Sequence, residues 1–255
     1  QRSSVTAYTP TTTQAITNYI PQLMTAAAGQ ARFDYDPITR AAKGLLIEET
    51  RTNTGLQSED FATTWAATRT TVSTNVLISP TGALTADNLI ATTDNNTHFL
   101  TQTFTGTAAS WTFSVYAKAA GYGFIALRLF NGTSQVGLAY YNLSTGATGT
   151  VTAGTATITS VGNSWYRCTL TATLAASASC TADIYVASAD NTNSFAGNAW
   201  NGIYVWGAQL EAGSFATSYI PTVASSVQRN ADVASMTGTN FSSWFNSSEG
   251  TFVAF

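Results

Sequence analysis

The segment Trp111-Thr112-Phe113-Ser114-Val115-Tyr116-Ala117-Lys118 decides the fold class of this chain. Its residues alternate, so one side of an extended strand carries Trp111, Phe113, Val115 and Ala117, and the other carries Thr112, Ser114 and Lys118. A period of two residues indicates a half-buried antiparallel strand, with one side on the core and one in water.

The same pattern recurs along the middle of the chain. Further strands are expected at residues 123–130, 135–143, 155–160, 165–172, 181–187 and 203–210, and only residues 84–89 and a few short stretches could be helical. Turn signals such as Asn131-Gly132 and Gly162-Asn163 separate the strands; Asn-Gly favours a tight hairpin whose central residues accept a positive φ. This spacing predicts an all-β protein built on an antiparallel jelly-roll β-sandwich.

The two ends of the chain differ from this middle. Residues 1–54 are interpreted as an irregular arm followed by a short hairpin, in which a strand runs into the turn at Asp36-Pro37, residues 38–43 form the loop and residues 45–47 form the second strand. Residues 55–222 are expected to form the sandwich. Residues 223–255 are expected to be a polar linker and, from Gly250, the first strand of a further, truncated β domain.

Composition excludes several functions. Charged residues make up 9% of the chain, against roughly 25% in an ordinary globular domain. With Lys+Arg 10 against Asp+Glu 13 and no basic cluster, nucleic acid is not an expected partner. No apolar run approaches the roughly 20 residues of a membrane span, so membrane insertion is not expected either. The polar, uncharged surface suits an extracellular location and hydrogen bonding to neutral partners such as sugars.

Cys168 and Cys180 are the only cysteines, so a disulfide framework cannot replace a core. Both lie on the apolar side of an alternating pattern. They are interpreted as small buried core residues, with a single bridge between neighbouring strands as the alternative.

Three stretches carry a resemblance to a known family: Arg32-Phe33-Asp34-Tyr35-Asp36-Pro37, Gly44-Leu45-Leu46-Ile47-Glu48-Glu49 and Arg51-Thr52-Asn53. Together they resemble a segment of bacteriophage fibre, tailspike-like and head-decoration proteins, where it precedes a jelly-roll domain. Ser58-Glu59-Asp60-Phe61 is similar to the opening of that domain, and Val205-Trp206-Gly207-Ala208-Gln209-Leu210 is similar to its closing strand. The resemblance covers about residues 30 to 235.

The resemblance implies a structural protein of the virion, on the head or tail surface, which contacts other virion proteins and host-surface glycans. Such fibres are usually homo-oligomers, commonly trimers. The middle strands also resemble jelly-roll carbohydrate-binding modules, which keeps open a secreted bacterial module attached to a glycanase. A decoration protein without a ligand and a polysaccharide depolymerase are further alternatives; the depolymerase would require a β-helix repeat, and none is seen.

Catalysis is not expected. His98 is the only histidine, no Gly-x-Ser-x-Gly motif accompanies it, and one His with two Cys leaves too few ligands for zinc. Paired carboxylates can hydrolyse glycosidic bonds, but Asp34 and Asp36 are interpreted as structural ion-pair partners, and the consecutive Glu48 and Glu49 should face opposite ways.

Aromatic residues are the candidates for ligand binding, because their rings stack on sugars while amide side chains hydrogen-bond sugar hydroxyls. Trp200 lies beside an Asn/Asp-rich loop, and the predicted carbohydrate-binding residues are Trp200, Tyr140, Tyr141, Asn191 and Asn193. For each aromatic ring, the alternative interpretation is a place in the sandwich core or at a subunit interface. Glu59 and Asp60, where the sandwich begins, are weak candidates for a calcium site; no other cofactor is expected.

Overall fold

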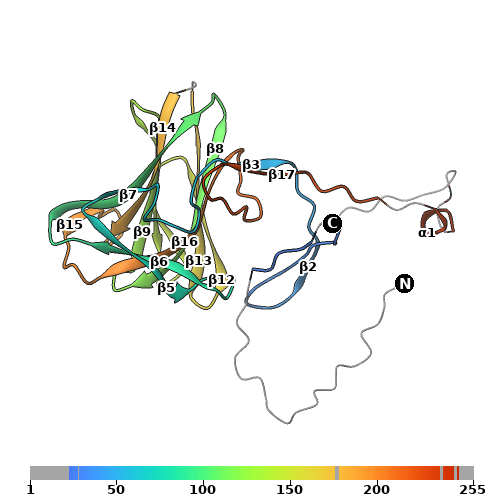
Figure 1. Ribbon diagram of the computed structural model, residues 1–255, viewed down its shortest axis with the longest axis horizontal. Coiled ribbons are helices and arrows are strands. Elements are labelled where there is room, and N and C mark those ends of the chain that lie inside the picture. Colours follow the sequence, from blue (N-terminus) through green and yellow to red (C-terminus); the bar gives the residue numbers. More distant parts are fainter. Residues whose placement is uncertain (1–22, 28, 176–177, 236–237, 244–245, 247–255) are drawn as a thin grey trace, which may run out of the picture.

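The computed structural model describes residues 23–27, 29–175, 178–235, 238–243 and 246. Figure 1 shows a two-layer body of strands, from which a hairpin and the C-terminal segment extend to one side. The predicted strand that begins at Gly250 and most of the predicted arm lie outside the described residues. Within the described residues, no helix is long and apolar enough to cross a membrane.

One layer is a seven-stranded sheet. Its strands are β4 (Ala66–Thr68), β7 (Asn95–Gly106), β9 (Phe124–Phe130), β10 (Gln135–Asn142), β11 (Ala147–Ala153), β14 (Ala178–Ala187) and β15 (Ser194–Ala196). They lie in the order β11-β10-β9-β14-β7-β15, and β4 also pairs with β7. All of these pairings are antiparallel.

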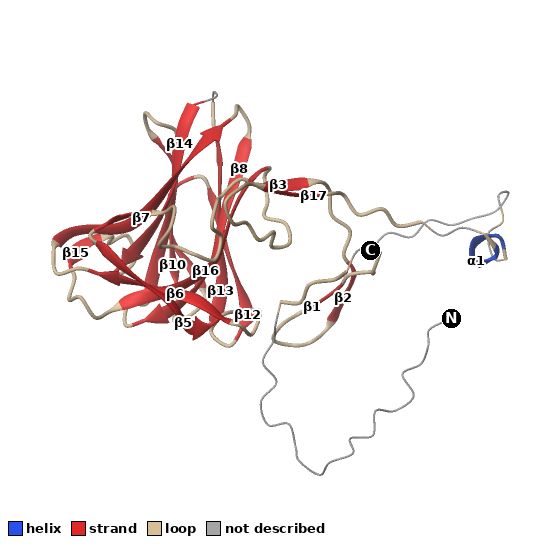
Figure 2. Cartoon of the chain, in the orientation of Figure 1, coloured by secondary structure: helices blue, strands red, loops and turns tan. Residues whose placement is uncertain are grey.

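The other layer has six strands. They are β5 (Thr70–Ile78), β6 (Leu84–Ala91), β8 (Ser110–Ala120), β12 (Thr155–Gly162), β13 (Trp165–Thr173) and β16 (Gly202–Ala212). Their order is β12-β13-β8-β16-β6-β5, again antiparallel (Figure 2). The chain passes repeatedly between the two layers, and the predicted antiparallel jelly-roll sandwich is confirmed.

The core lies between the sheets, where inward-facing side chains of both layers meet. Phe113 and Val115 on β8 are buried in it, as predicted from their alternation. Cys168 and Cys180 are also buried there and are not joined by a disulfide, which agrees with the first interpretation of these residues. Trp111 belongs to the same core, and Trp165 and Trp206 pack in a second cluster.

The outer face of β8 is not exposed to water, contrary to the prediction of a half-buried strand. Thr112 and Ser114 are fully buried. The chain that follows β16 covers them: the Thr112 hydroxyl donates to the Gly213 carbonyl at 2.8 Å, and Arg167 donates to Ser114 Oγ at 2.9 Å and to the Thr217 carbonyl at 2.7 Å. The period of two residues therefore predicted the strand correctly, but hydrogen bonds from other segments cover its polar side.

Residues 84–89, which could be helical from the sequence alone, form a strand instead. This segment lies in strand β6, whose alternate residues Asp87, Leu89 and Ala91 are buried while it pairs with β5 and β16. Tertiary pairing overrides a weak local helix propensity.

The N-terminal hairpin is confirmed, with a different second strand. β1 (Phe33–Tyr35) pairs antiparallel with β2 (Ala42–Leu45), so the second strand starts earlier than the expected residues 45–47. The register shifts between Asp34 and Tyr35, and Gly44 at φ 104° lies at this bulge.

A small sheet and a network of charges attach this hairpin to the sandwich. β3 (Arg51–Asn53) pairs with β17 (Val227–Arg229), and both ends of the 32–53 segment contact the chain after β16. We call residues 46–53, 212–218 and 227–232 the junction. Beyond it, the short helix α1 (Thr239–Ser242) lies apart from the sandwich (Figure 1).

Candidate functional site

Trp200 is the outstanding exposed aromatic residue of the sandwich: 82% of its surface is accessible. It lies in the turn between β15 and β16. The Asn198 side chain shapes this turn, because its Oδ1 accepts hydrogen bonds from the backbone N–H groups of Trp200 at 3.0 Å and Asn201 at 2.8 Å. Ala199 has a φ of 62°, which completes the tight reversal.

The backbone of this turn is fixed to the neighbouring strand end. The Ala199 N–H donates to the Ala91 carbonyl at 3.0 Å, and the Ala91 N–H donates to the Asn201 carbonyl at 3.2 Å. Gly197 adds a bond to the Asp94 carbonyl at 3.3 Å. The indole is therefore held out in water on an anchored backbone, so little backbone ordering would oppose ligand binding.

Tyr141 does not join this surface. It is fully buried, and its hydroxyl crosses between the sheets to donate to the Thr169 carbonyl at 2.8 Å. Burial raises the pKa of Tyr141 well above its usual value. Its assignment as a sugar-binding residue is wrong, because position 141 faces the core side of β10.

Tyr140 faces the opposite side of β10 from Tyr141, as expected for adjacent residues of a strand, but it is also buried. It packs with Leu138 and Tyr185 in a cluster on the outer face of the seven-stranded sheet. Burial, with the nearby Asp190 carboxylate, raises the pKa of Tyr140. The ring is not available for stacking on a ligand.

Asn191 and Asn193 lie in the loop between β14 and β15. Asn191 is exposed at a φ of 55°, and Asn193 is half-buried. The preceding Asp190 accepts from the Thr150 N–H at 2.8 Å and the Thr150 hydroxyl at 2.9 Å on β11, at the edge of the sheet opposite β15. The loop thus leads away from Trp200 before it returns, and these residues do not form one cluster.

Sequence reasoning missed a polar and aromatic cluster on the outer face of the seven-stranded sheet. Asp183 on β14 is fully buried, accepts from Arg128 Nε on β9 at 2.6 Å and also accepts from the Thr101 hydroxyl. The Arg128 guanidinium lies 5.2 Å from the Tyr185 ring centroid, and Tyr185 stacks on Phe99 at 4.8 Å. The residues are far apart in sequence, and only the strand order brings them together.

The weak calcium candidates are engaged in local hydrogen bonds. Glu59 accepts from the Tyr219 hydroxyl at 3.0 Å, while Asp60 accepts from the Ala62 N–H at 3.0 Å and from the Thr63 hydroxyl. Among the described residues, no group of three or more His, Cys, Asp or Glu side chains is placed to hold a metal ion.

The contacts of His98 are those of a structural residue rather than a catalytic one. It is fully buried on β7, and its Nδ1 and Nε2 lie 2.6 Å from the Arg69 carbonyl and 3.1 Å from the Phe195 carbonyl. Its contacts join β15 to the turn before β5, and no hydroxyl or thiol nucleophile is among its hydrogen-bond partners.

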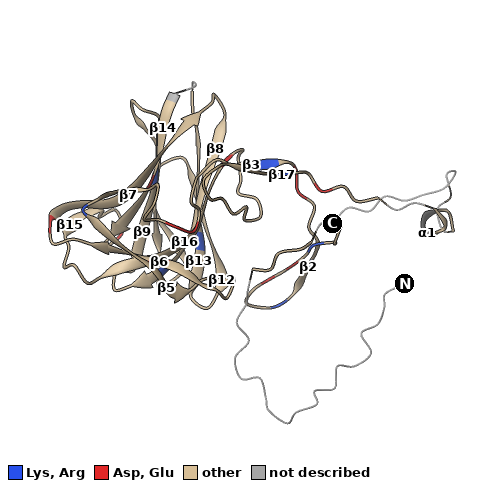
Figure 3. Ribbon diagram, viewed as in Figure 1, with Lys and Arg blue, Asp and Glu red and all other residues tan. Residues whose placement is uncertain are grey.

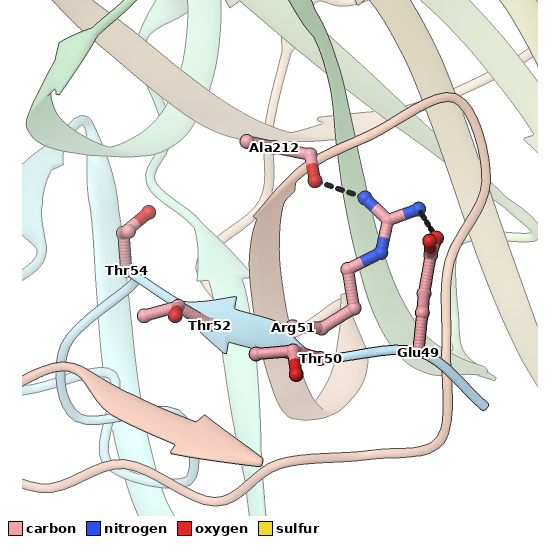
Figure 4. Close-up of a pocket in the computed structure, with 6 residues that line it drawn as sticks. All are labelled: Glu49, Thr50, Arg51, Thr52, Thr54 and Ala212. Carbon is pink, nitrogen blue, oxygen red and sulfur yellow. Dashed lines mark hydrogen bonds and ion pairs between the residues drawn. The ribbon is translucent and has the colours of Figure 1, made fainter. Parts of the chain in front are cut away.

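A shallow cleft of about 310 Å³ lies at the junction, lined by Glu49, Thr50, Arg51, Thr52, Thr54 and Ala212 (Figure 4). Arg51 is its strongest donor, but it already donates to the Ala212 carbonyl and to Glu49, and it lies 4.8 Å from the Phe215 ring centroid. The cleft is therefore better explained by the attachment of β3 than by a ligand.

Comparison with known proteins identifies no family: no family model and no curated protein matches the chain. Among solved structures, the enzymatically active domain of bacteriophage CBA120 tailspike protein 4 matches with a TM-score of 0.39 and 16% identity, over 62% of this chain and 21% of that chain. A CBM4 structure matches with a TM-score of 0.35 and 13% identity, over 62% of this chain and 84% of that chain.

The CBM22-1-GH10 modules of endo-1,4-beta-D-xylanase 10B from Clostridium thermocellum, solved with xylohexaose, match with a TM-score of 0.38 and 14% identity, over 69% of this chain and 30% of that chain. The match spans about a fifth of the tailspike chain and less than a third of the xylanase chain. At these scores the likenesses carry no argument about function.

Proposed function

We propose that this protein is a non-catalytic module of a bacteriophage virion, located on the head or tail surface, that binds glycans on the host surface weakly. Trp200 carries the glycan-binding part of the proposal. A solvent-exposed indole on a fixed backbone is suited to stack on the apolar face of a sugar ring.

The virion part of the proposal is supported by the resemblance of residues 32–53 to phage fibre and decoration proteins. The structure adds a compatible architecture: a sandwich with a small, ion-paired junction and a hairpin directed away from it (Figure 2). The non-catalytic reading is supported by the structural contacts of His98 and by the ion pairs of the acidic residues near the hairpin.

Glycan binding is tested with an array of bacterial surface polysaccharides, followed by titration of any positive glycan. Trp200→Ala should weaken binding at least tenfold, since buried Trp contacts are typical interface hot spots. Trp200→Phe should retain part of the affinity, and Val233→Ala, at another exposed apolar residue, should retain all of it. Equal affinity of the Trp200→Ala protein and the unmodified protein would remove Trp200 from the proposal.

Virion location is tested by immunogold electron microscopy of purified particles, with antibody raised against residues 55–222. Label at fibre tips or on the tail supports host adhesion, and label over the capsid supports decoration as the main role. Particles without label, with the protein only in the soluble lysate, would contradict the virion assignment and favour a secreted carbohydrate-binding module attached to a glycanase.

A further inference from the structure

The hairpin β1–β2 has one apolar face. Residues directly opposite each other in an antiparallel pair lie on the same face. Phe33 is opposite Leu45, and Tyr35 is opposite Ala42, so these four side chains share one face. All are exposed: 60% of Phe33, 57% of Tyr35 and 47% of Leu45 is accessible.

The opposite face carries the charges. Asp34 alternates with Phe33 and Tyr35, and its carboxylate lies 3.7 Å from Lys43 Nζ. Asp36 is occupied in the turn, where it accepts from the N–H groups of Ile38 at 2.9 Å and Thr39 at 2.7 Å. The hairpin is thus amphipathic, with a neutralised charged face suited to water and an apolar face that lacks a partner within the described chain.

The base of the hairpin is fixed, although its face is open. The Leu46 N–H donates to the Arg32 carbonyl at 2.8 Å, and Arg32 in turn donates to Glu48 at 2.8 Å and to Ser218 at 3.2 Å. A two-stranded hairpin is marginally stable by itself in water. This hairpin is presented at a set position, where covering its apolar face would stabilise it.

We propose that this face is a self-association interface, covered by the same face of a second copy of the chain. The face has no charged side chain, so it cannot bind a charged partner by electrostatic complementarity. An identical face is also apolar and uncharged, and it meets itself across a symmetry axis. Such an isologous contact closes as a two-fold dimer, in contrast to the trimer that the resemblance implies.

The size of the face sets the expected strength. Phe33, Tyr35, Leu45 and the flanking exposed residues Ile38 and Ile47 offer roughly 500 Å² of apolar surface, taking about 150–250 Å² for a whole aromatic side chain. Two copies would bury roughly 1,000 Å² in total, the lower limit of a specific interface. The proposal therefore predicts reversible association that depends on concentration.

Sedimentation velocity of the full chain over a range of concentrations tests this. The unmodified chain should associate, and Phe33→Ser with Tyr35→Ser should raise the dissociation constant at least tenfold. Val233→Ser is the matched control: Val233 is 92% exposed but lies outside the hairpin, and it should not change association. Unchanged tryptophan fluorescence of the double variant shows that the sandwich core is intact.

Disulfide trapping gives a second measurement that does not depend on weakening the hairpin. Tyr35→Cys should form a covalent dimer with oxidised glutathione, while Val233→Cys should not, since the native cysteines are buried. A chain that is monomeric at every concentration, or association and trapping equal in the hairpin and control variants, overturns the proposal. Glycan binding by Trp200 is a separate result, so either proposal can fail alone.

Discussion

The substitution Glu48→Gln tests whether the junction is held by its buried charge. Only 11% of the Glu48 side chain is exposed. Its carboxylate accepts from Arg32 at 2.8 Å, from the Ser218 N–H at 2.7 Å and from Arg229. Glutamine keeps the shape of the side chain but removes the charge that faces the two guanidinium groups.

The expected loss follows from these contacts. Removing one partner of a buried ion pair costs about 3–5 kcal/mol, because it leaves the other charge without compensation. Arg32 and Arg229 are partly exposed, and Arg32 keeps a second partner in Asp232. We therefore expect about 2–3 kcal/mol, the range of charged hydrogen bonds, and expect it in the docking of the junction rather than in the sandwich.

Lowering the pH should destabilise the junction, as the substitution Glu48→Gln does. Burial alone would raise the pKa of Glu48, but the hydrogen bonds from Ser218 and Arg32 and the charge of Arg229 outweigh it and lower the pKa below the usual 4.5. A carboxylate with a lowered folded-state pKa stabilises the fold above its unfolded-state pKa. That contribution is lost as the pH falls through the folded-state value. The junction should therefore open below about pH 4.5, before the sandwich core unfolds.

Hydrogen exchange read at β3 and β17 measures this opening, with core strand β8 as the internal reference. Glu48→Gln should speed exchange in β3 and β17 by at least tenfold and leave β8 unchanged. Asp34→Asn is the control: Asp34 and Lys43 are each 49% exposed, and an exposed pair contributes at most about 1 kcal/mol. Equal effects of the two substitutions, or exchange that rises equally in β8, would refute the reasoning.

Two further predictions concern single atoms. Gly213→Ala should lower the melting temperature by several degrees, because φ is 146° and the added Cβ would overlap the Arg51 guanidinium and displace it from the Ala212 carbonyl. An unchanged melting curve would show that Arg51 does not need this position. Cys168 should resist iodoacetamide in the folded protein and react after unfolding in urea, because burial raises the pKa of its thiol well above the usual value; mass spectrometry of native and unfolded samples measures this.

The alternation of apolar and polar residues predicted the strands that pack on the core. It did not predict the burial of side chains that a distant segment of the chain covers. The segment from Trp111 to Lys118 was placed correctly as β8, but the burial of Thr112 and Ser114 depends on Gly213 and Thr217, about a hundred residues later. The local pattern of strand β6 also allowed a helix, because its partner strands are not visible in that pattern. Non-local pairing decides both cases.

The candidate site was predictable only where exposure follows from local chemistry. Asn198 precedes Trp200 by two residues, and its turn holds the indole outward, so the loop composition was informative. The pair Tyr140-Tyr141 could not be resolved by the same means. Alternation requires the rings to face opposite sides of β10, but which side is open depends on Leu138, Tyr185 and the Asp190 loop.

Charged residues are concentrated in the junction and the hairpin rather than in the sandwich. Six ion pairs occur among the described residues, and four of them involve the junction residues Glu48, Glu49, Arg51, Arg229 and Asp232. Figure 3 shows charged residues along this segment and the hairpin, and few on the sandwich. The sandwich carries one of the six pairs, Arg128–Asp183, and otherwise depends on an apolar core whose burial does not involve protonation. The position of the hairpin depends on charge, so acid should release the proposed self-association face while Trp200 stays on an intact sandwich.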